Sequence, residues 1–216
     1  MKLTLLFLFF VLAILTEVQS SPEFPSHWWQ EVPDNELASW EINPSSVKLS
    51  DGEVILSKRN ELGLLSNFAS TPFEFEGKKY ATIEGFWQSM KYPENDKDER
   101  WSKAQWPFKR VEVEQMQGFD AKKAGSFASK VMKEMDINYV TYKGKKLDYK
   151  TPKKAEHYQI IKAAMIAKMR QNAKVLELLL ATKKLKLMPD HTTSPSDPPA
   201  WKYYKIWMEI RSDLQN

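Results

Sequence analysis

The chain of 216 residues carries a net charge of +4 and no cysteine, which excludes disulfide frameworks, thiol nucleophiles and thiolate metal sites. Its seven glycines form neither a Gly-x-Gly-x-x-Gly nor a Walker loop, so dinucleotide and P-loop folds are disfavoured. The three histidines lack metal-ligand spacing, and we therefore expect no metal site and no cofactor. Eight tryptophans and eleven phenylalanines can supply a core that is stabilised by packing alone.

An apolar run opens the sequence. Lys2 precedes the apolar residues 3–15, and residues 18–20 read Val-Gln-Ser, which is typical of a secretory signal peptide. Because the run is shorter than the ~20 residues of a membrane-spanning helix, a cleaved leader over residues 1–20 is favoured over a retained anchor. We therefore expect a secreted or periplasmic protein with no membrane segment after the leader is removed.

The next segment, residues 21–50, is interrupted by prolines and carries Trp28, Trp29 and Trp40. It is expected to be an irregular arm that its tryptophans attach to a body over residues 51–216. The body begins with a predicted strand at residues 53–57, which contain consecutive apolar side chains. Residues 76–78 then separate two short runs, and their Glu-Gly-Lys sequence predicts a hairpin turn.

A helix is predicted from Ile83, with Thr82 as its amino-terminal cap and Glu84 in its first turn. Glu84, Gln88 and Lys91 recur at helical spacing and form a polar stripe. The apolar stripe beside it consists of Ile83, Phe86, Trp87 and Met90. The positive end of the helix favours the ionised carboxylate by ~0.3–1 kcal/mol. The polar stripe is either one wall of a site or the solvated edge of an ordinary amphipathic helix.

The remaining chain is expected to be mostly helical. The predicted elements are a turn-rich segment over 93–109, a helix over 121–135 capped by Asp120, a strand over 137–142, a long helix over 153–184 that breaks near Asn172, and a proline-rich loop over 189–199. At residues 203–214 the alternation of Ile206, Met208 and Ile210 favours a strand over a helix. The predicted fold class is α+β, predominantly helical, with a single domain and a few short strands.

Positive charge is concentrated in one part of the sequence. Residues 143–186 contain 13 Lys or Arg and three acidic residues, whereas the whole chain has a net charge of +4, so the remainder is acidic. Such a stretch can attract phosphates or anionic surfaces. The alternative is a solvated helix face rich in lysine, and the scarcity of arginine argues against tight bidentate phosphate binding.

Residues 60–92 resemble the NADAR family, the NAD- and ADP-ribose-associated domains that include a bacterial riboflavin-pathway N-glycosidase. The matching elements are Leu-Ser-Asn-Phe at 65–68, a hairpin at 72–80 and a Thr-x-Glu-x-x-x-Gln-x-x-Lys helix at 82–91, in the family's order and spacing. Residues 167–169 and 178–182 are similar to the family's long helix and its ending, and residues 208–211 to its closing segment. The resemblance therefore extends over about residues 59–211 and implies a single NADAR-like domain.

Two parts of the family pattern differ in this chain. The family's Asp-x-x-Trp-Gly element and glycine-rich loop correspond to residues 191–202, where Asp197 and Trp201 are four positions apart and glycine is absent. Asp190 is a second candidate for this acid. The tryptophan that precedes the family's long helix is also missing, because Lys153 or Lys154 falls there.

The resemblance implies cleavage of an N-glycosidic bond at C1 of a ribose, or removal of ADP-ribose from an acceptor base. Glu84 would stabilise the positive charge that develops on the sugar, although acids also occur in first helical turns for stability alone. Asp197 or Asp190 would activate water or assist the leaving group. Lys91 would bind a phosphate or attack C1 of an opened ribose as an amine, with a solvated helix lysine as the alternative.

Substrate-binding residues are implied on the same elements. Asn67 would hold a ribose hydroxyl, or it is a turn residue that caps the preceding strand. Trp87 would stack on the base, although its spacing, like that of Phe86, also fits core packing. The predicted binding set is Ser66, Asn67, Phe68, Trp87, Gln88 and Trp201.

Several functional classes remain open from the sequence. One is an N-glycosidase or ADP-ribosyl hydrolase that acts on a nucleotide-like small molecule or an ADP-ribosylated acceptor, including an ADP-ribosylated nucleic-acid base. Another is a secreted ADP-ribose- or nucleotide-binding module that has lost catalysis, which the altered Asp-x-x-Trp-Gly element favours. A toxin or effector delivered to another cell is a further interpretation, based on the leader and the basic stretch.

Overall fold

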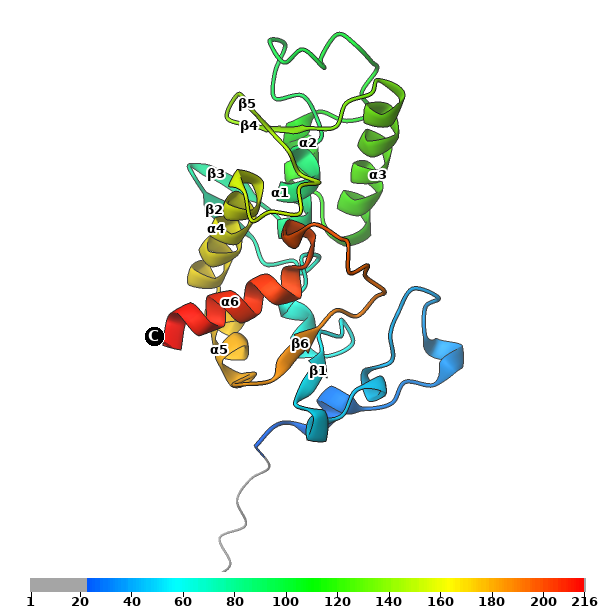
Figure 1. The fold of residues 1–216 in the computed structure, drawn as a ribbon, viewed down its shortest axis with the longest axis vertical. Coiled ribbons are helices and arrows are strands. Elements are labelled where there is room, and N and C mark those ends of the chain that lie inside the picture. The colour runs from blue at the N-terminus through cyan, green and yellow to red at the C-terminus, as the bar shows by residue number, and fades with distance from the viewer. Residues whose placement is uncertain (1–22, 216) are drawn as a thin grey trace, which may run out of the picture.

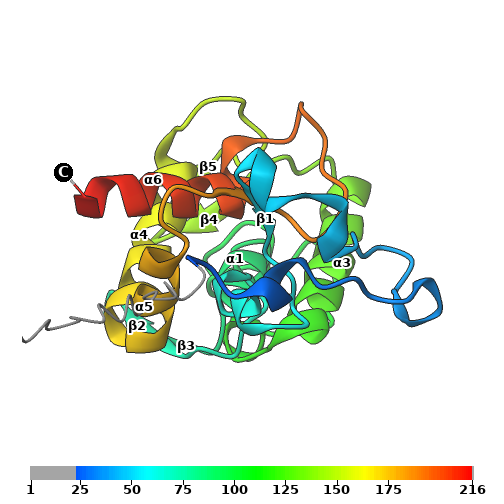
Figure 2. The same ribbon diagram turned by 90° about the horizontal axis from the view of Figure 1, so that it is seen from below.

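The computed structural model describes residues 23–215, so the predicted leader lies outside the described residues. The short helix α1 (Ile83–Ser89) lies in the middle of the fold, between α4 (Glu156–Gln171) and α3 (Gly118–Glu134) (Figures 1 and 2). The Thr82 hydroxyl accepts a hydrogen bond from the Gly85 amide at 2.8 Å, which confirms the predicted cap. All residues of α1 except Trp87 are buried, so this helix has no face in open solvent.

The other helices cover this centre. Helix α2 (Arg110–Glu114) packs on α1, and α5 (Ala173–Ala181) follows α4 after a single break. That break lies at Asn172, which confirms its predicted position. Helix α6 (Tyr203–Gln215) closes the described chain and packs across α4 and α5 (Figure 1).

The strands are short and form three separate pairs in the described residues. Strand β1 (Glu53–Ile55) pairs in parallel with β6 (Lys186–Met188), whereas β2 (Phe73–Phe75) with β3 (Lys78–Tyr80), and β4 (Val140–Tyr142) with β5 (Lys145–Leu147), are antiparallel. The predicted hairpin is confirmed at β2–β3, where Glu76 and Gly77 have φ values of 51° and 80°. Two successive left-handed residues are typical of the tight turn that matches strand twist. The α+β class with mostly helical content is therefore confirmed.

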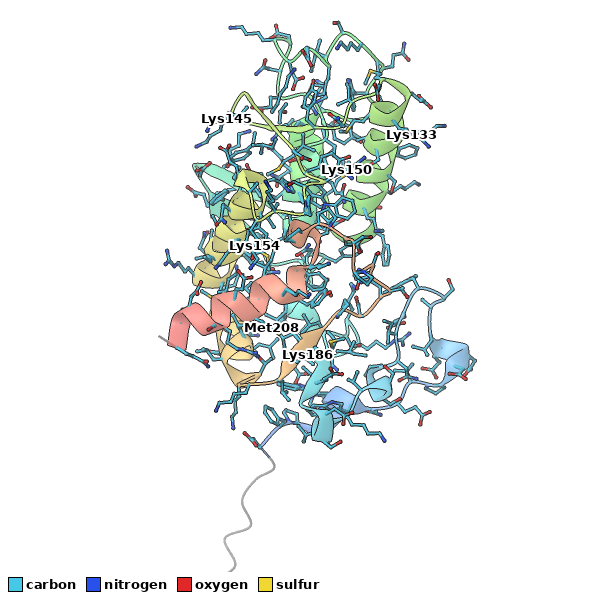
Figure 3. All side chains as sticks on the ribbon, viewed as in Figure 1. Lys133, Lys145, Lys150, Lys154, Lys186 and Met208 are labelled. Carbon is cyan, nitrogen blue, oxygen red and sulfur yellow. The ribbon has the colours of Figure 1, made fainter. Side chains whose placement is uncertain are left out.

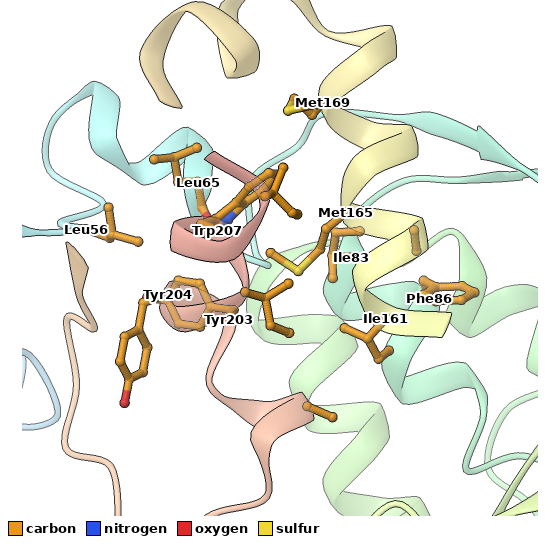
Figure 4. Close-up of a cluster of buried hydrophobic side chains, with 14 of the residues drawn as sticks. Leu56, Leu65, Ile83, Phe86, Ile161, Met165, Met169, Tyr203, Tyr204 and Trp207 are labelled. Atoms are coloured by element: carbon orange, nitrogen blue, oxygen red, sulfur yellow. The ribbon is translucent and has the colours of Figure 1, made fainter. Parts of the chain in front are cut away.

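The core lies where α1, α4 and α6 meet. Ile83 and Phe86 of α1 lie close to Ile161 and Met165 of α4, and Trp207 of α6 packs in the same cluster (Figure 4). The Trp207 indole donates to the Leu65 carbonyl at 2.6 Å, so its buried N–H is satisfied. Phe86 is thus a core residue, which agrees with the packing alternative given for it above.

Two details of the predicted helices are wrong. Residues 203–214 form helix α6, not a strand, because Tyr203, Ile206, Trp207 and Ile210 make a buried stripe at helical spacing. The alternating positions that favoured a strand include Met208, which is only partly buried. In addition, α3 begins at Gly118, and Asp120 lies inside its first turn rather than at the cap.

A buried arginine organises the turn-rich segment over 93–109. The Arg100 guanidinium is fully buried and donates to the carbonyls of Lys91 and Tyr92 at 3.1 Å each. It also pairs with Asp98 at 2.7 Å. These carbonyls follow the last turn of α1, where unsatisfied acceptors and the negative end of the helix favour a cation. Arg100 therefore fixes the carboxyl-terminal end of the central helix.

The arm is attached to the body through its tryptophans. The Trp28 indole donates to the Glu61 carboxylate at 2.6 Å, and the Trp29 indole donates to the Glu53 carbonyl at 2.8 Å. Trp28 is buried together with Phe24 in the main core cluster. Trp40 instead lines a cavity beside α1.

Many lysines of the basic stretch pair with acids at the surface, where several are labelled in Figure 3. Lys145 pairs with Glu156 at 2.8 Å, and Lys186 pairs with Glu53 at 2.6 Å. Lys154 likewise pairs with Glu209. These exposed pairs contribute little stability, but they match much of the excess charge. The solvated lysine-rich face is therefore the better description of these residues.

Candidate functional site

One side of α1 borders a cavity of about 570 Å³. Its walls come from α1, the segment 66–68, the start of α3, residues 191–201 and Trp40 of the arm. Nine of the predicted site residues line it, namely Ser66, Asn67, Phe68, Glu84, Trp87, Gln88, Lys91, Asp197 and Trp201. The predicted polar stripe thus faces this cavity.

Glu84 and Gln88 of α1 and Lys91, two residues after its end, form a polar row along the cavity. The Gln88 amide donates to Glu84 Oε1 at 2.7 Å, and the Lys91 ammonium donates to Ser129 Oγ at 2.9 Å. Gly125 lies against this row, and the Gln88 carbonyl oxygen is buried without a hydrogen-bond partner. A buried unsatisfied acceptor at a cavity wall can accept a hydrogen bond from a ligand or water.

Burial shifts the two charged residues of this row toward their neutral forms. Desolvation raises the pKa of Glu84, against the opposing effects of the Gln88 hydrogen bond and of electrostatic interactions with Lys122, Lys91 and His191. Desolvation also lowers the pKa of Lys91 to about 8, although Glu84 acts in the opposite direction. Desolvation is thus the largest influence on the pKa of Glu84, and it acts against the stabilisation of the ionised form that is expected from the helix end.

The segment 66–68 is fixed from behind by a buried lysine. Lys168 of α4 is fully buried and donates to the carbonyls of Leu64 and Ser66 at 3.0 and 3.1 Å. The Asn67 carbonyl accepts from the Glu84 amide at 2.9 Å, which joins this segment to the first turn of α1. The Asn67 side-chain oxygen is buried at the cavity without a partner, so this amide is free to hold a ligand hydroxyl.

The two candidates for the second acid lie in different places. Asp190 is fully buried, pairs with Lys58 and with His191 Nδ1 at 3.0 Å, and does not line the cavity. Burial acts to raise the pKa of Asp190, but the hydrogen bonds from His191 and Lys58 outweigh it and leave the pKa lowered. Asp197 lines the cavity and accepts from the Ser194 amide at 2.7 Å. Only Asp197 is therefore in direct reach of a ligand.

Aromatic rings form one end of the cavity. Trp87 and Trp201 line it, with ring centroids 6.5 Å apart, and Trp201 stacks on Tyr149 at 6.2 Å. The Lys91 ammonium lies 5.1 Å from the Trp87 ring. His157 packs on Trp87 at 4.7 Å, and burial lowers its pKa to about 4, so it is neutral near pH 7. This end offers planar apolar surface beside a cation.

Several lining residues were not predicted. The cavity is also bordered by Trp40, Lys58, Phe119, Lys122, His191 and Tyr203. Trp40 and Lys58 precede the stretch that resembles the family, and local periodicity does not relate them to α1. The exposure of large aromatic side chains is the signal that marks Trp40 and Phe119, and only the structure provides it.

The structure gives no sign of a metal centre or a membrane helix in the part of the chain that it describes. Within residues 23–215, no group of three or more His, Asp or Glu side chains is arranged to hold a metal ion. Over the same range, none of the helices combines the length and the apolar character needed to span a bilayer.

Comparison with known proteins gives one structural likeness. The sequence matches no family model and no curated protein. The NMR structure of the E. coli protein YbiA is similar over 74% of this chain and 82% of YbiA, with 22% sequence identity and a TM-score of 0.43. Neither a family nor a function follows from a likeness of this size. The resemblance to the NADAR family therefore stays a prediction from the sequence motifs.

Proposed function

We propose that the protein hydrolyses an N-glycosidic bond at C1 of a ribose in a nucleotide-like or ADP-ribose-type substrate. The observation that carries this proposal is the Glu84 carboxylate, which is 5% exposed yet lines the cavity. An acid that only stabilises a helix end needs no burial, because that effect also operates at exposed ends. Burying a carboxylate is unfavourable, so a buried carboxylate at a cavity wall is better explained by a role in the reaction than by helix stability.

In the proposed reaction the C1–N bond breaks, and the base leaves with the bonding electrons. Ionised Glu84 would stabilise the positive charge left on C1, and a group of this kind typically contributes ~3–4 kcal/mol. Asp197 would accept a proton from the water that attacks C1, while the departing base takes up a proton. The net change is the addition of one water across the C1–N bond.

The raised pKa of Glu84 is compatible with this role. Desolvation makes the ionised form of Glu84 less stable. A cationic ribose carbon would offset that penalty, and it would do so more strongly in the transition state than in the bound substrate. An interaction that strengthens in the transition state is the kind that accelerates a reaction.

The other charges of the cavity favour an anionic substrate. Lys91 and Lys122 line it, and their ammonium groups can contact a phosphate of the substrate. Lys58 also lines it, with Asp190 as its ion-pair partner. Lys91 is assigned to the phosphate in this proposal, with attack on an opened ribose as the alternative role for its amine.

A binding module without catalysis is the second candidate. The observation that favours it is the state of the second acid: Asp190 is buried and paired, and Asp197 accepts a hydrogen bond within its own loop.

Export of the protein through the leader at residues 1–20 is also proposed. It predicts that removing these residues retains the protein in the cytoplasm, and an unchanged location would contradict export.

The test uses Glu84→Gln, with Glu177→Gln as the control for loss of an acid on an exposed helix position. Wild type and variants are incubated with NAD, with DNA carrying ADP-ribosylated guanosine and with aminouracil ribotides, and released base or sugar is measured. Glu84→Gln should lower turnover about 10²–10³-fold with the fold intact. Near-full activity of this variant would remove Glu84 from the mechanism. Binding of ADP-ribose without cleavage by the wild type would select the binding module.

A further inference from the structure

Three aromatic rings from separate parts of the chain meet at the cavity wall. Trp40 of the arm and Phe119 of α3 have ring centroids 5.6 Å apart, and Phe68 lies 5.2 Å from Phe119. All three line the cavity. Trp40 is 38% exposed and Phe119 is 56% exposed, although both are large apolar side chains. Exposed rings grouped at a cavity commonly mark a surface that a ligand covers.

The backbone contacts of the arm hold Trp40 in this place. The Ile42 amide donates to the Asp190 carbonyl at 2.9 Å, and Glu41 forms an isolated bridge with His191. The Glu41 carboxylate also pairs with Arg59 at 2.7 Å. The residues that follow Trp40 are thus tied to the same loop that supplies His191 to the cavity. The ring is part of the wall and not of a free terminal segment.

A fixed cation lies beside these rings. The Lys58 ammonium is 4.9 Å from the Trp40 ring centroid and 5.1 Å from that of Phe68. Its ion pair with buried Asp190 limits its movement. A cation next to planar aromatic surface suits a ligand that carries a phosphate adjoining a planar ring.

We infer that Trp40, Phe119 and Phe68 form a subsite for a second planar ring of the ligand, with Lys58 facing the phosphate that joins it to the ribose. The cavity would then select dinucleotide-type ligands, in which two ringed ends are joined through phosphates, over mononucleotides. The assignment of the reacting ribose to the Glu84 end rests on the proposed function. The subsite itself depends only on the rings and on Lys58.

Calorimetric titration of Trp40→Ala with ADP-ribose and with ribose 5-phosphate tests the subsite. ADP-ribose carries the second ring and ribose 5-phosphate lacks it. The variant should bind ADP-ribose about 10- to 100-fold more weakly, as expected for loss of one ring stack, and ribose 5-phosphate unchanged. Phe119→Ala should give the same pattern, and Trp40→Phe should recover most of the affinity.

Trp101→Ala is the matched control, because Trp101 is 47% exposed and does not line this cavity. It should leave both affinities unchanged. Equal losses for both ligands in Trp40→Ala, an unchanged affinity for ADP-ribose, or no binding of ADP-ribose by the wild type would each overturn the subsite. Failure of every cleavage assay with this binding pattern intact would refute only the hydrolase proposal, so the two failures are distinguishable.

Discussion

Replacing Gly125 by alanine should perturb Glu84 without touching it. Gly125 lies in α3, and a Cβ atom at this position would lie 1.7 Å from Gln88 Oε1 and 2.1 Å from Gln88 Cδ. These distances are far below van der Waals contact, but the three nearest atoms all belong to one side chain, that of Gln88. Gln88 therefore has to move, and its 2.7 Å hydrogen bond to the Glu84 carboxylate is lost.

Gly125→Ala should change turnover and stability through two contributions, the loss of a hydrogen bond and a gain in helix propensity. A hydrogen bond to a charged group contributes about 1.5–3 kcal/mol, so loss of the Gln88 contact should lower turnover by about 10- to 150-fold if it orients ionised Glu84. Alanine in place of glycine inside a helix contributes about 0.8–1.0 kcal/mol of stability. The two terms partly offset each other in the folded state, so the melting temperature should change by only a few degrees.

The assay compares turnover and thermal unfolding of Gly125→Ala with those of Ser126→Ala. Ser126 is the next residue on the exposed side of α3, and its hydroxyl bonds only the carbonyl of Lys122 at 3.0 Å. Ser126→Ala should retain full turnover. Full turnover in Gly125→Ala as well would refute the claim that Gln88 positions Glu84. A large fall in melting temperature would show that α3 moves instead of Gln88.

The remaining predictions concern the phosphate and the second acid. Because burial lowers the pKa of Lys91 to about 8, the affinity for ribose 5-phosphate should fall as pH rises through that value, and Lys91→Ala should remove this dependence. Calorimetry from pH 7 to 9.5 measures it, and turnover that instead rises through pH 8 would favour the amine nucleophile. Asp197→Asn should lower turnover with little change in melting temperature, since Asp197 lines the cavity. Asp190→Asn should lower the melting temperature by several degrees, because hydrogen bonds to charged groups contribute about 1.5–3 kcal/mol each. The opposite pattern would exchange the roles of these two acids.

Local sequence signals predicted the elements that depend on local chemistry. The Thr82 cap, the Glu76-Gly77 turn and the Asn172 break each depend on the conformational preference of one or two residues. Helix α6 was mispredicted because its sequence satisfies both periods, and only packing against α4 and α5 decides between them. The role of Arg100 at the end of α1 was invisible for a similar reason, since the acceptors there are the backbone carbonyls of Lys91 and Tyr92, which carry no sequence signal.

The residues of the candidate site likewise include some that local spacing predicted and others that only the tertiary fold brings together. Glu84 and Gln88 lie on α1 and Lys91 lies in the turn that directly follows it, so their spacing alone predicted a shared face, and all three line the cavity. Lys58 and Asp190 pair across 132 positions of sequence, and Trp40 reaches the cavity only through contacts of the arm with the same distant loop. Such contacts depend on the tertiary fold, and no pattern within the segments themselves encodes them.

The electrostatics of the cavity restrict which ligands suit it. The same burial raises the pKa of Glu84 and lowers that of Lys91, so both side chains shift toward neutral forms. A phosphate favours protonated Lys91, and a positive ribose carbon favours ionised Glu84. A binding module needs only the phosphate interaction, whereas a hydrolase also needs the developing positive charge. Glu84 is therefore the residue that separates the two functions, because a ground-state nucleotide supplies no cation to offset the desolvation of its carboxylate.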